Sequence, residues 1–251
     1  MVILPFYQFL IGFAEKDQTK YVFLAPNDRP VPADIPLQFP SYHSASRILY
    51  GILNKDGRDV IVRAPVQPSP MDFSPLFTLS NDPIFYTAIS PDNIKVAFLT
   101  KDPVSSEIQL RVIIHEEFGW FPLPFLRLPA ACRPVCFCSS DILIYTDPTG
   151  SLKAVRLNKP VKVVEIAPSG HTPACCVSNN SKAFIQDEKI IVFNEIKSEI
   201  DVKNPLFLSF SKNQKDLFFS EGNVLYKYDM TARQKQIIFQ GALPIVFIAE
   251  L

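Results

Sequence analysis

Glycine is scarce in this sequence, at 8 of 251 residues. Since glycine is the residue that most easily takes a positive φ, most tight turns of this chain must be built from Asn, Asp and Ser. An excess of charge of either sign is also missing, because 25 Lys and Arg residues balance 25 Asp and Glu residues. Without a basic patch or a run of like charges, the chain offers no electrostatic footprint for nucleic acid, and we predict no nucleic-acid partner.

Long helical and membrane-spanning patterns are absent as well. No stretch repeats apolar residues with the 3.6-residue period of a long helix. Residues 1–14 are apolar, but they lack a basic leader region, contain Pro5 and Gln8, and are too short to cross a bilayer. We interpret them as a strand and expect no membrane span. The five cysteines do not have the spacing of a secreted scaffold, so we expect a reducing compartment and a cytoplasmic location.

The signature motifs of common enzymes are missing too. The chain has no Gly-x-Ser-x-Gly elbow, no phosphate-binding loop, no dinucleotide-binding glycine motif and no His-Glu-x-x-His. The sequence therefore gives no catalytic residue, and we expect no cofactor.

The cysteines do not have the spacing of a metal site. Cys132, Cys136 and Cys138 lie close together, and Cys175 is followed directly by Cys176. A structural zinc site needs four ligands, and its cysteines usually come in Cys-x-x-Cys pairs. We interpret these cysteines as small apolar core residues and predict no metal site.

What the chain does contain is a recurring unit of short strands. Each unit has an apolar strand, a turn that begins with Ser, a second strand, a tight turn and a third strand. The turn serines are Ser90, Ser139, Ser178 and Ser211. They lie about 40 residues apart, which is the length of a four-stranded propeller blade. One blade cannot bury both of its faces alone, so the units must stack, here into a ring.

Two of these units resemble the repeats of TolB-type and WD40-like β-propellers. The resemblance rests on Ser90-Pro91-Asp92 with the strand at 95–98, and on the similar turn at Ser211 with the strand at 224–229. In that family such turns join the two inner strands of a blade, although Asn93 stands where the family usually has Gly. The resemblance implies an all-β ring, and such rings carry out binding and catalysis alike.

Counting strands along the chain gives five sets, which begin near residues 47, 84, 133, 173 and 206. The first set lacks a clear fourth strand, and residues 195–203 are either a fourth strand or a helical turn. Three strands in residues 6–39 and one at 243–249 are left over, and their pairing would close the ring and remove its exposed edge. We predict an all-β six-bladed propeller in one domain, 1–251, with the sixth blade split between 1–40 and 242–251. Two stacked β-sandwiches are the alternative.

A polar set marks the positions where the chain enters the predicted ring near its axis. Each member falls just before an expected innermost strand, so together they would line one mouth of the central channel and bind a ligand there. The set is His43, Asp82, Arg133, His171 and Asn204. The alternative is that they are ordinary turn residues at which strands begin.

An aromatic segment follows the third strand of the second set. It contains Phe118, the only tryptophan, Trp120, and Phe121. Exposed aromatic side chains of this kind are typical anchors for a protein partner. The alternative is an outermost strand that packs on the neighbouring blade. The predicted function is therefore a binding or scaffold module for protein–protein interaction, with a hydrolase or lactonase-like enzyme at the ring axis as the alternative.

Overall fold

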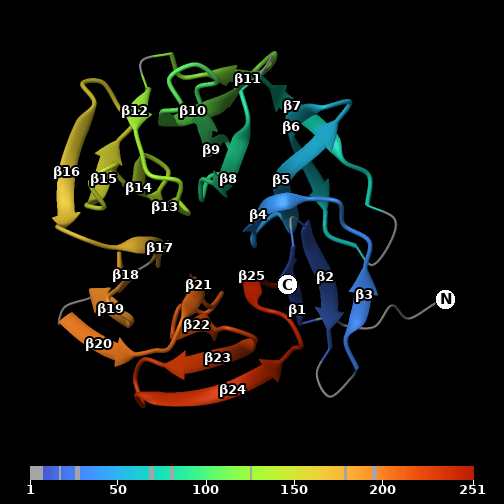
Figure 1. The fold of residues 1–251 in the computed structure, drawn as a ribbon, viewed down its shortest axis with the longest axis vertical. Coiled ribbons are helices and arrows are strands. Elements are labelled where there is room, and N and C mark those ends of the chain that lie inside the picture. Colours follow the sequence, from blue (N-terminus) through green and yellow to red (C-terminus); the bar gives the residue numbers. More distant parts are fainter. Residues whose placement is uncertain are drawn as a thin grey trace.

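The computed structural model describes residues 8–16, 18–25, 29–67, 71–79, 82–124, 126–177, 180–193 and 197–251. These residues form 25 strands and no helix, arranged as six sheets around one axis (Figure 1). None of the described segments is a helix long and apolar enough to cross a membrane. The fold is the predicted six-bladed β-propeller, and the alternative of two stacked sandwiches is wrong.

Each sheet is one blade, and we number the blades in the order of their innermost strands. Blade 1 consists of β4 (Gln38–His43), β5 (Ile48–Lys55), β6 (Arg58–Pro65) and β7 (Ser74–Thr78). Blade 2 consists of β8 (Ile84–Ile89), β9 (Lys95–Lys101), β10 (Ile108–Glu116), β11 (Gly119–Pro122) and the short β12 (Leu128–Pro129). Blade 3 consists of β13 (Cys136–Ser139), β14 (Ile142–Thr146), β15 (Leu152–Arg156) and β16 (Lys162–Ala167).

The remaining three blades follow the same plan. Blade 4 consists of β17 (His171–Cys175), β18 (Lys182–Gln186), β19 (Lys189–Phe193) and β20 (Lys197–Asp201). Blade 5 consists of β21 (Pro205–Phe210), β22 (Asp216–Glu221), β23 (Val224–Asp229) and β24 (Gln234–Gln240). Blade 6 consists of β25 (Ile245–Glu250), β1 (Phe9–Glu15), β2 (Gln18–Leu24) and β3 (Val31–Ala33).

The ring closes where the two ends of the chain pair. β25 and β1 run antiparallel, with Leu10 opposite Ala249 and Ile11 opposite Ile248. The predicted partnership of the terminal apolar segments is therefore confirmed. β1 is thereby paired on both sides, with β25 and with β2, while β25 is the innermost strand of the blade, as β4 is of blade 1.

The hydrophobic core lies between the blades. Six clusters of buried side chains fill the six interfaces between neighbouring blades. In β22, for example, Leu217 and Phe219 pack toward blade 4 while Phe218 packs toward blade 6. Because successive side chains of a strand point to opposite faces, a strand between two neighbours must be apolar at every position. This requirement explains continuous apolar runs such as residues 96–99.

Blade 1 differs from the strand assignment made on the sequence. The sequence pattern assigns all three strands of residues 6–39 to the split blade and leaves the first set without a clear fourth strand. Instead, β4 is the innermost strand of blade 1, and β3 is the outermost strand of blade 6. Pro40 lies where the pairing of β4 with β5 shifts register, between Gln38 and Ser41, so its missing N–H interrupts no regular ladder.

The turns that begin with serine join the two inner strands of a blade, as predicted. In the turns at Ser90 and Ser211, the serine Oγ accepts a hydrogen bond from the backbone N–H five residues later, at 2.9 and 3.0 Å. Ser139 joins β13 to β14 by a shorter turn, and its partner in the ladder is Ile142. Ser178 lies outside the described residues. Residues 197–201 form the fourth strand of blade 4 rather than a helical turn.

Candidate functional site

A channel runs along the axis of the ring and encloses a cavity of about 960 Å³. Its wall is built from the innermost strands, which all run in the same direction. We call the side on which these strands begin the start face and the side on which they end the end face. Contacts between neighbouring strands fit this arrangement: the ends of β4 and β8 are joined by a hydrogen bond of 3.0 Å between His43 Nε2 and the Pro91 carbonyl.

Three innermost strands carry a bulky residue with positive φ. Phe39, Tyr86 and Thr172 have φ values of 46°, 46° and 50°, and each lies where the ladder shifts register. A bulge of this kind redirects a side chain, and positive φ is unfavourable for such residues. All three line the cavity, and the rings of Phe39 and Tyr86 lie 4.7 Å apart. The wall is therefore shaped at the cost of backbone strain, which is often found at functional sites.

Arg133 and His171 are polar residues of the cavity wall near the start face. Both line the cavity. Burial lowers the pKa of His171, and the positive charge of Arg133 lowers it further. His171 Nδ1 lies 2.9 Å from Thr172 Oγ1. A guanidinium and an imidazole on the same cavity wall suit an anionic or hydrogen-bonding ligand.

The other predicted channel residues lie elsewhere. His43 is the last residue of β4 and not a residue before it, so it lines the cavity at the opposite, end face. Asp82 precedes β8 but forms an ion pair with Arg111, with 3.8 Å between Oδ2 and Nη1, and it does not line the cavity. Asn204 is exposed just before β21, with φ 51°, and is also outside the lining. The five residues therefore do not meet at one mouth: His43 lies at the opposite face because it ends β4, and Asp82 and Asn204 lie outside the lining.

The charges of the described cavity wall are mainly positive. Glu250 is the one acidic residue among those that line it, and its Oε2 accepts a 2.6 Å hydrogen bond from the Lys212 N–H. Lys16, Arg133 and Lys212 supply positive charge. The wall thus favours an anion over a hard cation, which would need several free carboxylates.

The predicted aromatic segment lies at the turn between β10 and β11. This turn is on the end face, where His115 N–H donates to the Ile94 carbonyl in the β8–β9 turn, at 2.7 Å. We call Phe118, Trp120 and Phe121 the aromatic turn. Phe118 is 87% exposed and Phe121 41% exposed. Trp120 is partly buried against the interface of blades 1 and 2, as the alternative interpretation of this segment expected.

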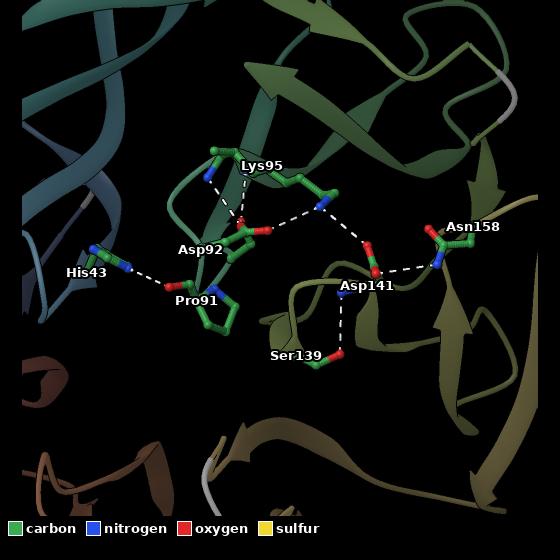
Figure 2. A network of polar contacts seen from close by, with 9 residues as sticks. His43, Pro91, Asp92, Lys95, Ser139, Asp141 and Asn158 are labelled. Atoms are coloured by element: carbon green, nitrogen blue, oxygen red, sulfur yellow. Dashed lines mark hydrogen bonds and ion pairs between the residues drawn. The ribbon is translucent and has the colours of Figure 1, made fainter. Parts of the chain in front are cut away.

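A polar network joins blades 2 and 3 near the same face (Figure 2). Lys95 Nζ lies 3.4 Å from Asp92 Oδ2 and 3.3 Å from Asp141 Oδ1. Burial disfavours the charge of Asp92, but hydrogen bonds from Ser90 and the nearby Lys95 outweigh it and lower the pKa of Asp92. Asp92 is thus held as the carboxylate inside the serine turn. The network holds blades 2 and 3 together at the end face. Both of its carboxylates, Asp92 and Asp141, are paired with Lys95.

Sequence reasoning missed a contact among three cysteines. Cys136 and Cys138 of β13 and Cys175 of β17 bring their sulfur atoms within 4.8 Å of one another. Cys138 and Cys175 form a disulfide. The expectation of inert cysteines was therefore wrong for this pair, because the residues lie 37 positions apart and meet only when blades 3 and 4 stack. The one signal in the sequence was the Cys-x-Cys spacing, which puts two thiols on one face of a strand.

Comparison with known proteins shows the fold. No protein-family model matches the chain, and no curated protein is similar to it in sequence. Among solved structures, TolB from Acinetobacter baumannii has a TM-score of 0.72 and 11% identity, with 96% of this chain and 66% of that chain covered. A chain from a nidogen–laminin complex has a TM-score of 0.66 and 10% identity over 96% and 97% of the two chains.

One part of a hydrolase also has a fold similar to that of this chain. The apo form of prolyl oligopeptidase B from Galerina marginata has a TM-score of 0.60 and 10% identity, and the match covers 94% of this chain but 41% of that chain. The chain therefore spans less than half of that enzyme. At these identities the likeness establishes a β-propeller and leaves function to the residues of this chain.

Proposed function

We propose that this propeller is a protein-binding or scaffold module whose partner docks on the end face over the aromatic turn. The observation that carries the proposal is the 87% exposure of Phe118 at the tip of that turn. A large aromatic side chain held in water is unfavourable, and burying it in a partner's pocket would contribute roughly 1.5–3 kcal/mol. Phe121, the third residue of β11, is 41% exposed and offers a second aromatic side chain on the same hairpin.

The turn is well built for this role because its backbone is fixed before any partner binds. Glu116 and Gly119 pair across it, and His115 opposite Trp120 continues the ladder. The Trp120 ring lies 5.1 Å from the His115 ring and packs against the core between blades 1 and 2. A preorganised anchor loses little conformational entropy on binding, which is the usual property of a hot-spot residue.

The comparisons support a binding role without identifying the partner. The nidogen–laminin structure contains a chain of similar fold in a complex of two proteins. In this chain the corresponding proposal is a protein partner that offers an apolar pocket to Phe118. The identity of the partner, the face on which it docks and its contact with Phe118 can each be tested directly.

Site-specific photo-cross-linking in the native host tests the proposal. A photoreactive phenylalanine analogue at position 118 should capture one partner in good yield. The matched control is position 104, because Val104 is 94% exposed but lies in the β9–β10 turn on the start face. Equal capture of the same protein from both positions, or none from position 118, would refute docking over the aromatic turn.

A second proposal concerns the cavity, and the juxtaposition of Arg133 with His171 favours it. We propose that these two residues bind an anionic ligand near the start face, while His43, Asp82 and Asn204 do not share that site. The related alternative is a hydrolase or lactonase-like activity that uses His171 as a base. An activity screen on esters and lactones distinguishes them: His171→Ala should abolish turnover if the alternative holds, whereas a ligand site would show binding without turnover.

The cytoplasmic location suggested by the cysteine content also remains our proposal. The Cys138–Cys175 disulfide supports the opposite location, an oxidising compartment, because disulfides persist there. Fractionation of the native host with an antibody against the protein decides between them.

A further inference from the structure

The three sulfur atoms between blades 3 and 4 form a compact triangle. Cys136 and Cys138 alternate with Phe137 along β13, so both point to the face that meets blade 4. Cys175 approaches from the end of β17. Its Sγ lies 3.6 Å from Cys136 Sγ and is bonded to Cys138 Sγ. The sulfur atoms of all three residues lie within 4.8 Å of one another.

The surroundings of the triangle are apolar on one side and open to the channel on the other. Cys138 is 4% exposed and belongs to the hydrophobic cluster that also contains Ile144 and Phe184. Cys136 and Cys175 line the axial cavity. A small ion can therefore reach the sulfur atoms from the channel, and the apolar side keeps water away from it.

We propose that the reduced form of this cluster binds one soft monovalent metal ion, Cu(I), through the thiolates of Cys136, Cys138 and Cys175. Metal–thiolate bonds of about 2.3 Å place three sulfur atoms around one metal roughly 4 Å apart. The 3.6 Å between the Cys136 and Cys175 sulfur atoms is close to that value. Once the Cys138–Cys175 bond is reduced, the sulfur atoms of these two residues must move apart by side-chain rotation to reach it.

The ligand set favours copper over zinc. Soft sulfur ligands select Cu(I), whereas a structural zinc site is closed by four ligands. Within the described part of the chain, the cluster consists of three sulfur atoms and includes no histidine or carboxylate. The absence of tightly bound zinc that the sequence predicts is therefore compatible with this site.

A dithiol is the reductant that opens the Cys138–Cys175 bond. Two electrons and two protons pass from the dithiol to the Cys138–Cys175 bond, which gives two protein thiols and one oxidised dithiol. Cu(I) then replaces the protons of three thiols, and three protons leave to solvent. No change in the oxidation state of copper is involved.

The test is a Cu(I) titration of the full chain under anaerobic conditions, after reduction by dithiothreitol and its removal. Competition with a chromophoric Cu(I) chelator should show one ion per chain. X-ray absorption should show three sulfur neighbours at about 2.3 Å. Protein kept in the disulfide form should bind at least about tenfold more weakly, since two of the three ligands are then unavailable.

Single-cysteine variants test which residues bind Cu(I). Cys136→Ala, Cys138→Ala and Cys175→Ala should each weaken Cu(I) binding by at least about tenfold. Cys132→Ala is the matched control, because Cys132 is exposed and lies outside the triangle, and it should bind like the unaltered chain. Thermal melting of each reduced variant shows whether it is folded.

Several results would overturn the proposal. Reduced unaltered protein that fails to bind Cu(I) refutes it regardless of how the variants fold. A folded variant of any of the three cysteines that keeps full affinity refutes the ligand set, as does loss of binding in Cys132→Ala. One tightly bound zinc per chain, retained in the presence of Cu(I), refutes the choice of metal.

Discussion

Lys95 of β9 and Asp141 of the β13–β14 turn form an ion pair across the boundary between blades 2 and 3, with 3.3 Å between Nζ and Oδ1. Lys95 is only 8% exposed, and its ammonium group also lies 3.4 Å from Asp92 in its own blade. Lys95 is also the first residue of β9, directly after the Ser90 turn, and its backbone N–H donates to Ser90 Oγ. One lysine therefore links the local turn to the assembly of the ring (Figure 2).

Lys95→Met should lower the free energy of unfolding by about 1–2 kcal/mol, because it leaves two carboxylates without their shared cation. Asp141 is 44% exposed, so solvent screening keeps the effect at the lower end of that range. Urea denaturation measures the change. In a double-mutant cycle Asp141→Asn should cost less in the Lys95→Met background than alone, and strict additivity would argue against the pair.

Ser211→Ala should destabilise the protein by about 1–2 kcal/mol, because Ser211 is buried and its Oγ satisfies the Asp216 N–H while donating to Asn213 Oδ1 at 2.6 Å. Ser139→Ala is the control. Ser139 Oγ makes only a longer 3.3 Å contact with the Asp141 N–H, so its loss should cost clearly less. Equal midpoints of denaturation for the two variants would contradict the difference between the turns.

Removal of residues 242–251 should cause aggregation or loss of cooperative unfolding. The deletion removes β25, in which Ile245, Phe247 and Ile248 are all at most 5% exposed. Each such side chain contributes roughly 1.5–3 kcal/mol, so together they approach the net stability of a typical domain. The loss also exposes the β1 edge. A soluble truncated chain with the full-length melting temperature in calorimetry would contradict ring closure as a source of stability.

The imidazole of His171 should titrate below its ordinary value of about 6.5, and Arg133→Ala should raise its pKa toward that value. The folded pKa is depressed, so the unfolded chain binds the proton first as the pH falls. The contribution of His171 to stability is complete above about pH 6.5 and is lost as the pH falls toward the folded pKa. NMR titration of the three histidines measures this. An unchanged His171 pKa in Arg133→Ala would show that the two groups do not interact.

Much of the fold follows from local patterns. Strands buried on both faces leave continuous apolar runs, and the serine turns at Ser90 and Ser211 mark the junction of two inner strands, so the blades could be counted from the sequence. Closure was predictable because two apolar segments, one at each end, had no other partner. The innermost strand of blade 1 was less visible, because Pro40 and a positive φ at Phe39 break the expected pattern.

The candidate site was harder to predict because its contacts are long-range. His43 was placed at the wrong mouth as soon as β4 was misassigned, since one strand length separates the two faces. The three-cysteine cluster depends on how blade 3 stacks on blade 4, which no spacing within either blade reveals. Exposure of Phe118 and partial burial of Trp120 depend in the same way on where β11 meets the neighbouring blade.

The measurement that tests the central proposal most directly is the affinity of the purified protein for the partner captured at position 118. By calorimetry, Phe118→Ser should weaken binding by at least about tenfold, which corresponds to roughly 1.4 kcal/mol, while Val104→Ser should leave it unchanged. Phe118 is exposed, so neither change should alter the melting temperature appreciably. Equal affinities of the Phe118→Ser variant and the unaltered protein would contradict the proposal that the aromatic turn is the docking surface.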